Sequence, residues 1–157
     1  MQVFVYTLAT LAAFLGMELV AWFTHKYIMH GVLWVLHKDH HRKHKKRVER
    51  NDAFFLLFAL PSCLLFIGGI QGGFDVRFWI GLGIALYGLA YFLIHDLLIH
   101  QRVRVGFKPK STYLRALQKA HEGHHVPPGQ GPGECYGMLF FPYKYYKAAQ
   151  QHSDDLP

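Results

Sequence analysis

The chain alternates between long apolar runs and short polar stretches. Residues 3–24 carry a single charged side chain, Glu18, and residues 53–70 and 78–94 form two further apolar runs joined by the polar segment 71–77. At a rise of about 1.5 Å per residue, helices of these lengths match a hydrocarbon core of about 30 Å. The pattern predicts an all-α integral-membrane helical bundle in which the second and third runs form a helical hairpin.

A fourth apolar piece, residues 136–146, is rich in tyrosine and phenylalanine but short for a membrane span. We predict an interfacial segment there, so that residues 1–157 form a single membrane domain with three to four membrane helices. A signal peptide is the competing interpretation of residues 3–24. That run lacks a basic start and no A-x-A cleavage pattern follows it, so we interpret it as a span.

Composition agrees with a membrane setting, because hydrophobic residues make up 52% and charged residues only 17% of the chain, against a usual charged share of about 25%. The net charge is +7 with histidine neutral. Basic side chains concentrate at residues 37–50 and 101–119, beside the apolar runs. Such blocks can bind nucleic acid, but here the positive-inside rule explains them as cytoplasmic flanks of membrane helices. We therefore expect membrane lipid, and no nucleic acid, as a partner.

Histidine departs most from the background, with 12 in 157 residues. Ten of them form two sets that repeat the spacing H-x4-H followed by H-x2-H-H. The sets are His25, His30, His37, His40 and His41, and then His95, His100, His121, His124 and His125. A spacing this specific argues against histidines that merely gather near a membrane interface. We predict that all ten are metal ligands on the cytoplasmic side.

The spacing within each set has a physical reason. On a helix, positions i, i+3 and i+4 share one face, so each H-x2-H-H triplet is expected to converge on one metal. Positions i and i+5 lie about 140° apart on an ideal helix, so each H-x4-H pair needs a helix end, a π-bulge or two different metals. Ten imidazoles are too many for one tetrahedral zinc. The sequence therefore predicts two metal ions, although imidazole alone does not select iron over zinc, copper or nickel.

Acidic residues beside the patterned histidines have two interpretations. Residues 121–125 match the H-E-x-x-H pattern of zinc proteases, in which Glu122 is the general base. That interpretation leaves about seven patterned histidines without a role. We instead expect Asp39, Asp96 and Glu122 to accept hydrogen bonds that orient the imidazoles.

Several runs resemble the bacterial β-carotene 3-hydroxylases, a branch of the membrane fatty acid and sterol hydroxylase superfamily. These runs are HKYIMHG (25–31), HKDHH (37–41), Asn51–Asp52, HDLLIHQR (95–102) and AHEGHH (120–125). The resemblance extends from the first apolar run to about residue 142. H-x-x-H-H alone marks only the superfamily, whereas the longer runs in this order point to the carotenoid branch.

The resemblance implies a non-haem di-iron centre, held by the ten patterned histidines, with O2 as co-substrate. Zinc is expected as a possible substitute in isolated protein. The resemblance also implies a ferredoxin-like electron donor, a bacterial inner-membrane location and hydroxylation of a carotenoid at carbon 3 of its β-ionone ring. No nucleotide-binding motif occurs in the chain, which agrees with electrons from a separate protein. The loop at 42–50 is more basic than expected for the family.

A substrate dissolved in the bilayer needs a route to the metals. We expect aromatic residues near the histidine ends of the apolar runs to line it, namely Trp22, Phe23, Trp34, Tyr91 and Phe92. A sterol or fatty acyl hydroxylase or desaturase is the alternative within the same chemistry. A histidine-rich metal transporter is a remote alternative, because transport needs ionisable residues at membrane depth and only Glu18 lies within an apolar run.

Overall fold

The computed structural model of the chain describes residues 1–41, 48–103, 106, 109–126 and 133–154. Within those residues every regular element is a helix. In chain order these are α1 (Gln2–Phe23), the π-helix η1 (Thr24–Val32), α2 (Trp34–His37), the 3-10 helix η2 (Arg50–Phe54), α3 (Phe55–Gln71), α4 (Val76–Tyr91), the π-helix η3 (Phe92–Ile99), α5 (Thr112–His124) and α6 (Tyr143–Asp154). The all-α prediction is confirmed.

Three continuous helical segments of the described chain are long and apolar enough to cross a membrane. They are Gln2–Val32, Arg50–Gln71 and Val76–Ile99. Each runs past one end of the predicted span, because η1, η2 and η3 extend α1, α3 and α4 toward the patterned histidines. Their apolar side chains are largely exposed, with Leu8, Leu60 and Leu64 each more than half accessible. Exposed hydrocarbon over this length is what a lipid-facing helix presents.

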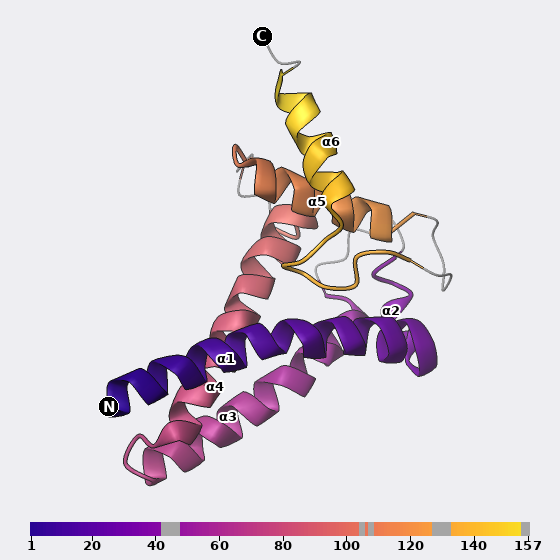
Figure 1. Cartoon of the computed structure of the whole chain (residues 1–157). Coiled ribbons are helices and arrows are strands. Elements are labelled where there is room, and N and C mark those ends of the chain that lie inside the picture. The colour runs from indigo at the N-terminus through magenta and orange to yellow at the C-terminus, as the bar shows by residue number, and fades with distance from the viewer. Residues whose placement is uncertain (42–47, 104–105, 107–108, 127–132, 155–157) are drawn as a thin grey trace.

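The α3–α4 hairpin packs against α1, and glycines set the close approach. A Cβ added to Gly83 on α4 would collide with the Thr10 carbonyl oxygen of α1, and one added to Gly69 on α3 would collide with the Phe78 backbone of α4. Small residues at helix crossings let membrane helices approach closely without a hydrophobic driving force between them. Figure 1 shows the hairpin tip near the start of α1 and α5 and α6 gathered at the opposite end.

Residues 136–146 do not form one regular element, and their position at the membrane interface stays a prediction. Residues 136–142 have no regular structure, and α6 begins at Tyr143. Met138 is buried with Met17, Ala21 and Tyr87 in the core, and the backbone N–H groups of the next two residues donate to a Glu18 carboxylate oxygen. The prediction missed this inward packing because the buried acceptor lies on α1, far away in the sequence.

Candidate metal centre

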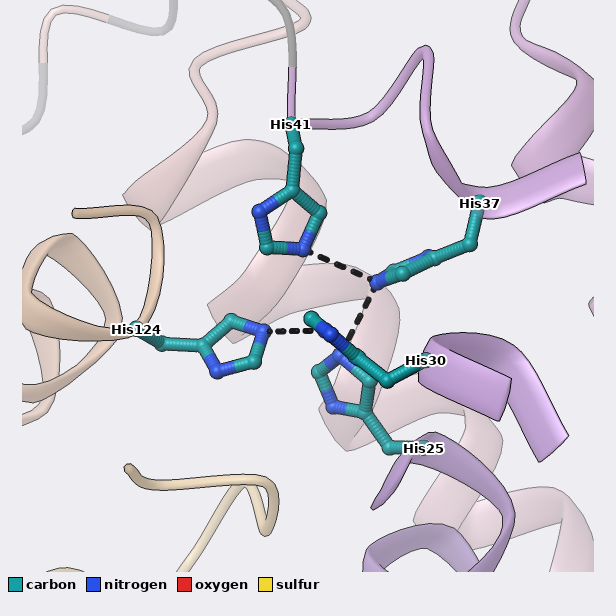
Figure 2. A group of neighbouring side chains, drawn as sticks. All are labelled: His25, His30, His37, His41 and His124. Atoms are coloured by element: carbon teal, nitrogen blue, oxygen red, sulfur yellow. Dashed lines mark hydrogen bonds between the residues drawn. The ribbon is translucent and has the colours of Figure 1, made fainter. Parts of the chain in front are cut away.

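Nine of the ten patterned histidines form two compact groups. The first group is His25, His30, His37, His41 and His124, and the second group is His40, His95, His100 and His121. Within each group, one potential ligand atom per ring lies within 4.8 Å of the others. Figure 2 shows the first group, whose rings come from η1, α2, the turn after α2 and α5 and point toward a common centre.

The tenth ring, His125, lies between the two groups. Its ring centroid is 4.3 Å from that of His41 in the first group and 4.6 Å from that of His121 in the second. Its Nε2 is 2.9 Å from the His121 Nε2. All ten histidines therefore meet in one region.

The prediction that each H-x2-H-H triplet serves one metal is wrong. His37 and His41 belong to the first group and His40 to the second, while His124 belongs to the first and His121 to the second. The first triplet does not lie on a continuous helix, because α2 ends at His37 and residues 38–41 form a turn. On α5, His121 and His124 are three residues apart with ring centroids 5.8 Å apart, which is close enough to serve two adjacent centres.

The H-x4-H pairs lie on π-helical turns, one of the three geometries allowed by their spacing. In a π-helix the N–H of residue i+5 bonds the carbonyl of residue i, so side chains five apart fall on one face. The His100 N–H donates to the His95 carbonyl in this way at 2.9 Å. The paired rings are consequently adjacent, with centroids 5.2 Å apart for His25 and His30 and 4.5 Å for His95 and His100.

Oxygen acceptors fix the protonation of five rings. Nδ1 of each of these rings lies within hydrogen-bond distance of an oxygen, so Nδ1 carries the proton and Nε2 carries a lone pair. The pairs are His25 with the Tyr136 carbonyl (2.9 Å), His37 with Asn51 Oδ1 (2.7 Å), His40 with Glu49 Oε2 (2.9 Å), His95 with Asp96 Oδ1 (2.9 Å) and His124 with the Glu134 carbonyl (2.9 Å).

The lone pairs of these rings face one another, which a cation explains. Nε2 of His25 and Nε2 of His37 are 3.1 Å apart, yet neither can donate once both Nδ1 atoms are protonated. Ligands at 90° around an ion with metal–nitrogen distances of about 2.1 Å are about 3.0 Å apart. In the second group, the Nε2 atoms of His40 and His95 are buried and have no hydrogen-bond partner among the described residues. The residues present therefore fit a pair of nitrogen-bound metal ions.

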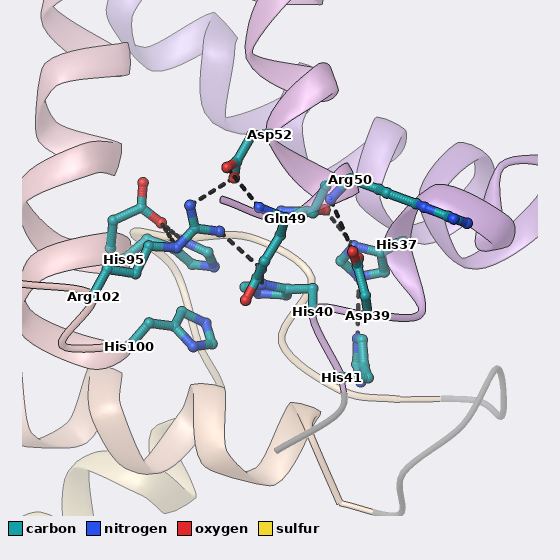
Figure 3. Close-up of polar contacts among 12 residues, drawn as sticks. His37, Asp39, His40, His41, Glu49, Arg50, Asp52, His95, His100 and Arg102 are labelled. Carbon is teal, nitrogen blue, oxygen red and sulfur yellow. Dashed lines mark hydrogen bonds and ion pairs between the residues drawn. The ribbon is translucent and has the colours of Figure 1, made fainter. Parts of the chain in front are cut away.

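An ion-pair network holds the carboxylates that bond Nδ1 of two rings of the second group (Figure 3). Glu49, the acceptor of His40, also receives a hydrogen bond from Arg102 Nη2 at 2.8 Å. The same guanidinium donates to Asp52 at 2.6 Å and lies 3.5 Å from Asp96, the acceptor of His95. One arginine thus holds both carboxylates that orient rings of the second group.

The three predicted acidic partners have different outcomes. Asp96 does contact its neighbouring ring, that of His95. Asp39 instead accepts a hydrogen bond from the Arg50 backbone N–H at 2.8 Å, so it joins the turn after α2 to η2. Glu122 is exposed and has no hydrogen bond to any imidazole in the described part of the chain.

Four ring partners were not predicted from the sequence: Glu49, Asn51, and the backbone carbonyls of Glu134 and Tyr136. Arg102 was not predicted either. Asn51 and Arg102 lie within runs that resemble the carotene hydroxylases, which was the only available signal. Their roles depend on contacts across the fold, since Arg102 reaches Glu49 over 53 positions of the chain.

Burial keeps the clustered imidazoles neutral. Burial, with repulsion from neighbouring rings, lowers the pKa of His41, His100 and His125 to about 2. Burial likewise lowers the pKa of His37 to about 3 and that of His124 to about 4, although a hydrogen bond to an oxygen acceptor opposes the shift in each. Only neutral imidazole binds a metal, so these rings are ready to do so at physiological pH.

An apolar cavity of about 480 Å³ leads away from the histidines between α3 and α4. At one end it is lined by His25, Asn51, Asp52, Asp96 and Tyr136. Its walls are mainly apolar side chains, and Phe55 and Leu89 on its rim are 66% and 53% exposed. The cavity therefore connects the histidine end with the apolar outer surface of the helices.

Two of the five predicted channel aromatics, Tyr91 and Phe92, line this cavity. Trp22 and Phe23 do not, and instead pack against Tyr27. Trp34 packs against rings of the first group, with its centroid 5.3 Å from those of His30 and His41. A role in substrate passage stays a prediction for Tyr91 and Phe92.

Comparison with known proteins agrees with the geometry. A family model described as fatty acid hydroxylase matches residues 10–143. The β-carotene hydroxylase of Paracoccus sp. (strain PC1) is 40% identical over 136 residues, which cover 86% of this chain and 83% of that protein. The β-carotene hydroxylase of Pantoea ananas is 41% identical over 128 residues, covering 82% and 73%. The chloroplastic β-carotene 3-hydroxylase 2 of Arabidopsis thaliana is 35% identical over 136 residues, covering 85% and 44%. No solved structure matches the chain.

The match covers all ten histidines and most of the three apolar helical segments, and the relatives are named hydroxylases. An oxidoreductase embedded in a membrane accounts for both features. The chain therefore belongs to the fatty acid hydroxylase family, alongside the β-carotene hydroxylases.

Proposed function

We propose that the chain is a β-carotene 3-hydroxylase that uses O2 to hydroxylate carbon 3 of carotenoid β-ionone rings, converting β-carotene to zeaxanthin. The observation that carries the proposal is an apolar cavity that reaches His25 of the first group, together with Asn51 and Asp96, which hold the rings of His37 and His95. Hydroxylase relatives at about 40% identity support the choice of a carotenoid as substrate.

Two iron ions are the metals that this chemistry requires. The first group and the second group would each hold one, with His125 placed between them. Bound iron would supply the activation of O2, which amino-acid side chains cannot perform. In the net reaction one oxygen atom enters a ring C–H bond, while two electrons and two protons reduce the other oxygen atom to water. Zinc, which also accepts imidazole ligands, is expected to replace iron in some isolated samples.

The protein itself contributes orientation and exclusion of water. Asn51, Glu49 and Asp96 fix the rings of His37, His40 and His95 so that Nε2 faces the metals. The apolar walls of the cavity, including Phe58 and Ile84, bind hydrocarbon and keep bulk water from the reacting carbon. A substrate dissolved in the bilayer can enter through the exposed rim without leaving lipid.

A ferredoxin-like protein is the proposed electron donor. Its acidic surface would dock on the basic residues at 42–50 and 102–119, of which residues 42–47, 104–105 and 107–108 lie outside the described part of the chain. Charge attraction of this kind weakens as salt screens it. Ferredoxin-supported turnover should therefore fall as ionic strength rises, and a rate that ignores salt would count against docking here.

We place the histidine end on the cytoplasmic side of a bacterial inner membrane. Arg102, Lys110, Arg115 and Lys119 cluster along the chain around α5, whereas at the hairpin tip Arg77 is paired with Asp75 at 2.7 Å. The positive-inside rule favours the basic end in the cytoplasm. A green fluorescent protein fused after residue 157 should fluoresce; a non-fluorescent fusion with an active alkaline phosphatase counterpart would reverse the orientation.

Expression in a β-carotene-accumulating bacterial host tests the function directly. The parent should yield zeaxanthin by chromatography, and His37→Ala should yield none, because His37 is 1% exposed within the first group. His152→Ala, which alters a histidine outside both sets, is the matched control and should behave as the parent. If the parent instead hydroxylated sterols or fatty acyl chains and left β-carotene unchanged, the alternative within the superfamily would replace this proposal.

A further inference from the structure

One glycine of α4 differs from the other glycines of that helix. Gly81 and Gly83 lie where helices touch: a Cβ on Gly81 would lie 3.1 Å from the Ser62 carbonyl oxygen, and one on Gly83 would collide with the Thr10 carbonyl oxygen. Both are needed for packing. A Cβ added to Gly88 would meet no atom within 4 Å. Close packing therefore does not explain glycine at position 88.

Backbone conformation does not explain it either. Gly88 lies inside α4 and has no positive φ angle, so a side chain there is unstrained. Glycine disfavours a helix interior relative to alanine because it loses more backbone freedom on folding. The open space beside Gly88 belongs to the cavity, which this residue lines together with Ala85 and Leu89. The missing side chain keeps that space empty.

The position of Gly88 along the cavity indicates which part of a substrate would occupy the space beside it. Gly88 precedes His95 by seven residues, which corresponds to about 10 Å along the helix axis. A carotenoid whose ring reaches the metals would have its chain, not the reacting carbon, at this depth. The wall opposite is α3, with Phe58, Ala59 and Ser62, and the Ser62 hydroxyl donates to the Gly81 carbonyl at 2.9 Å. The wall therefore presents hydrocarbon contacts at this level.

We propose that Gly88 is a specificity-determining residue, because its lack of a side chain leaves room for the long hydrocarbon chain behind the reacting ring. This inference rests on the proposed function, since it assigns part of the cavity to the substrate's chain. It explains how a cavity of about 480 Å³ with a surface rim accepts one end of a substrate whose remainder stays in lipid. A side chain at position 88 would select against long substrates and spare short ones.

The experiment compares Gly88→Leu and Gly88→Ala with Gly16→Leu. Gly16 is the matched control, because it is a helix-interior glycine with nothing within 4 Å of an added Cβ but does not line the cavity. Proteins are purified from β-carotene-producing cells. The β-carotene retained per chain is measured by absorbance, and iron is measured by elemental analysis. Turnover is measured with two substrates, β-carotene and β-ionone, and β-ionone has the same ring on a four-carbon chain.

We expect Gly88→Leu to lower β-carotene retention and turnover by about tenfold or more, the scale that one overfilled apolar contact is worth in a binding site. Iron content and β-ionone turnover should stay within about twofold of the parent. Gly88→Ala should have an intermediate effect and an unfolding temperature no lower than the parent's, and Gly16→Leu should match the parent.

Equal β-carotene retention and turnover in Gly88→Leu and the parent would overturn the inference. So would a parallel loss of iron and of both substrates, because that pattern indicates general damage. A parent that hydroxylates no carotenoid would refute the proposed function, and retention of β-carotene would still test the role of Gly88 independently.

Discussion

The two histidine groups contain the same ligand type but differ in what holds their rings. In the first group, the Nδ1 partners are uncharged oxygens from Asn51 and the backbone of Glu134 and Tyr136. In the second group, they are carboxylates of Glu49 and Asp96, both contacted by Arg102. A charged acceptor makes the imidazole a stronger electron donor to a metal. Metal ions held by the two groups would therefore not be equivalent.

The largest expected loss of metal and of activity comes from removing one ring of either group from α5, the helix that contributes to both. His121→Ala and His124→Ala both alter α5, yet the first change removes a ring of the second group and the other a ring of the first. Each should lower metal content from about two ions per chain to about one. Each should reduce hydroxylation by more than about 100-fold, because even outer hydrogen-bond partners are worth about 10–100-fold. Elemental analysis and pigment chromatography measure both effects, and loss of both ions in either variant would show that the groups are one site.

Substituting a carboxylate that orients a ring should lower metal affinity less than removing a ring, but more than substituting an exposed residue. Glu49→Gln retains the shape of the side chain and removes the charge behind His40. We expect metal affinity of the second group to fall by about 10–100-fold while the first group is unaffected. Anaerobic titration with ferrous ion measures the metal affinity of each group. Asn51→Asp, which adds a charge behind a ring of the first group, is the converse change. Equal weakening of both positions by Glu49→Gln would contradict the assigned difference.

Acid should destabilise the metal-free protein through buried rings of the first group. Burial lowers the pKa of His37 to about 3 and that of His124 to about 4, below the value of about 6.5 for an unfolded chain. Below pH 6.5 the unfolded state therefore binds more protons than the folded state, and each such ring costs up to about 1.4 kcal/mol of unfolding free energy per pH unit. The unfolding temperature in detergent should fall steadily from pH 7 to pH 5. A rise over that range would contradict the lowered pKa values of His37 and His124.

The smallest expected effect is at Glu122. Its side chain is exposed although it adjoins His121, so it contributes little to either group. Glu122→Gln should leave carotene hydroxylation and metal content within about twofold of the parent, as for other exposed substitutions. Abolished activity with intact metal content would restore a general-base role for this residue.

The sequence was sufficient to predict the helical spans and a cluster of histidines, but not how the histidines are grouped. Apolar runs and repeated H-x4-H spacing are local properties, and the π-helical turns at His25–His30 and His95–His100 agree with one geometry that the spacing allowed. The separation of His40 from His37 was not predictable, because it depends on α2 ending at His37. A helix that continued four residues further would have kept the triplet on one face.

The hydrogen-bond partners of the rings could not be predicted from the sequence for a related reason. Glu49 lies only nine positions from His40, but the intervening chain shows no periodic pattern that would place it there. Arg102 follows η3, and it meets Glu49 and Asp52 at the start of η2 only because the fold brings together residues about 50 positions apart in the chain. Glu18 was visible as an isolated charge in an apolar run, whereas its contacts with Tyr87 and with the backbone of residues 139 and 140 required the fold.

Anomalous X-ray diffraction from crystals of the iron-loaded protein, recorded at the iron absorption edge, tests the central claim most directly. We predict two iron peaks, one among the Nε2 atoms of His25, His37 and His124 and one among those of His40, His95 and His121. A single peak, or iron bound away from these rings, would contradict the account.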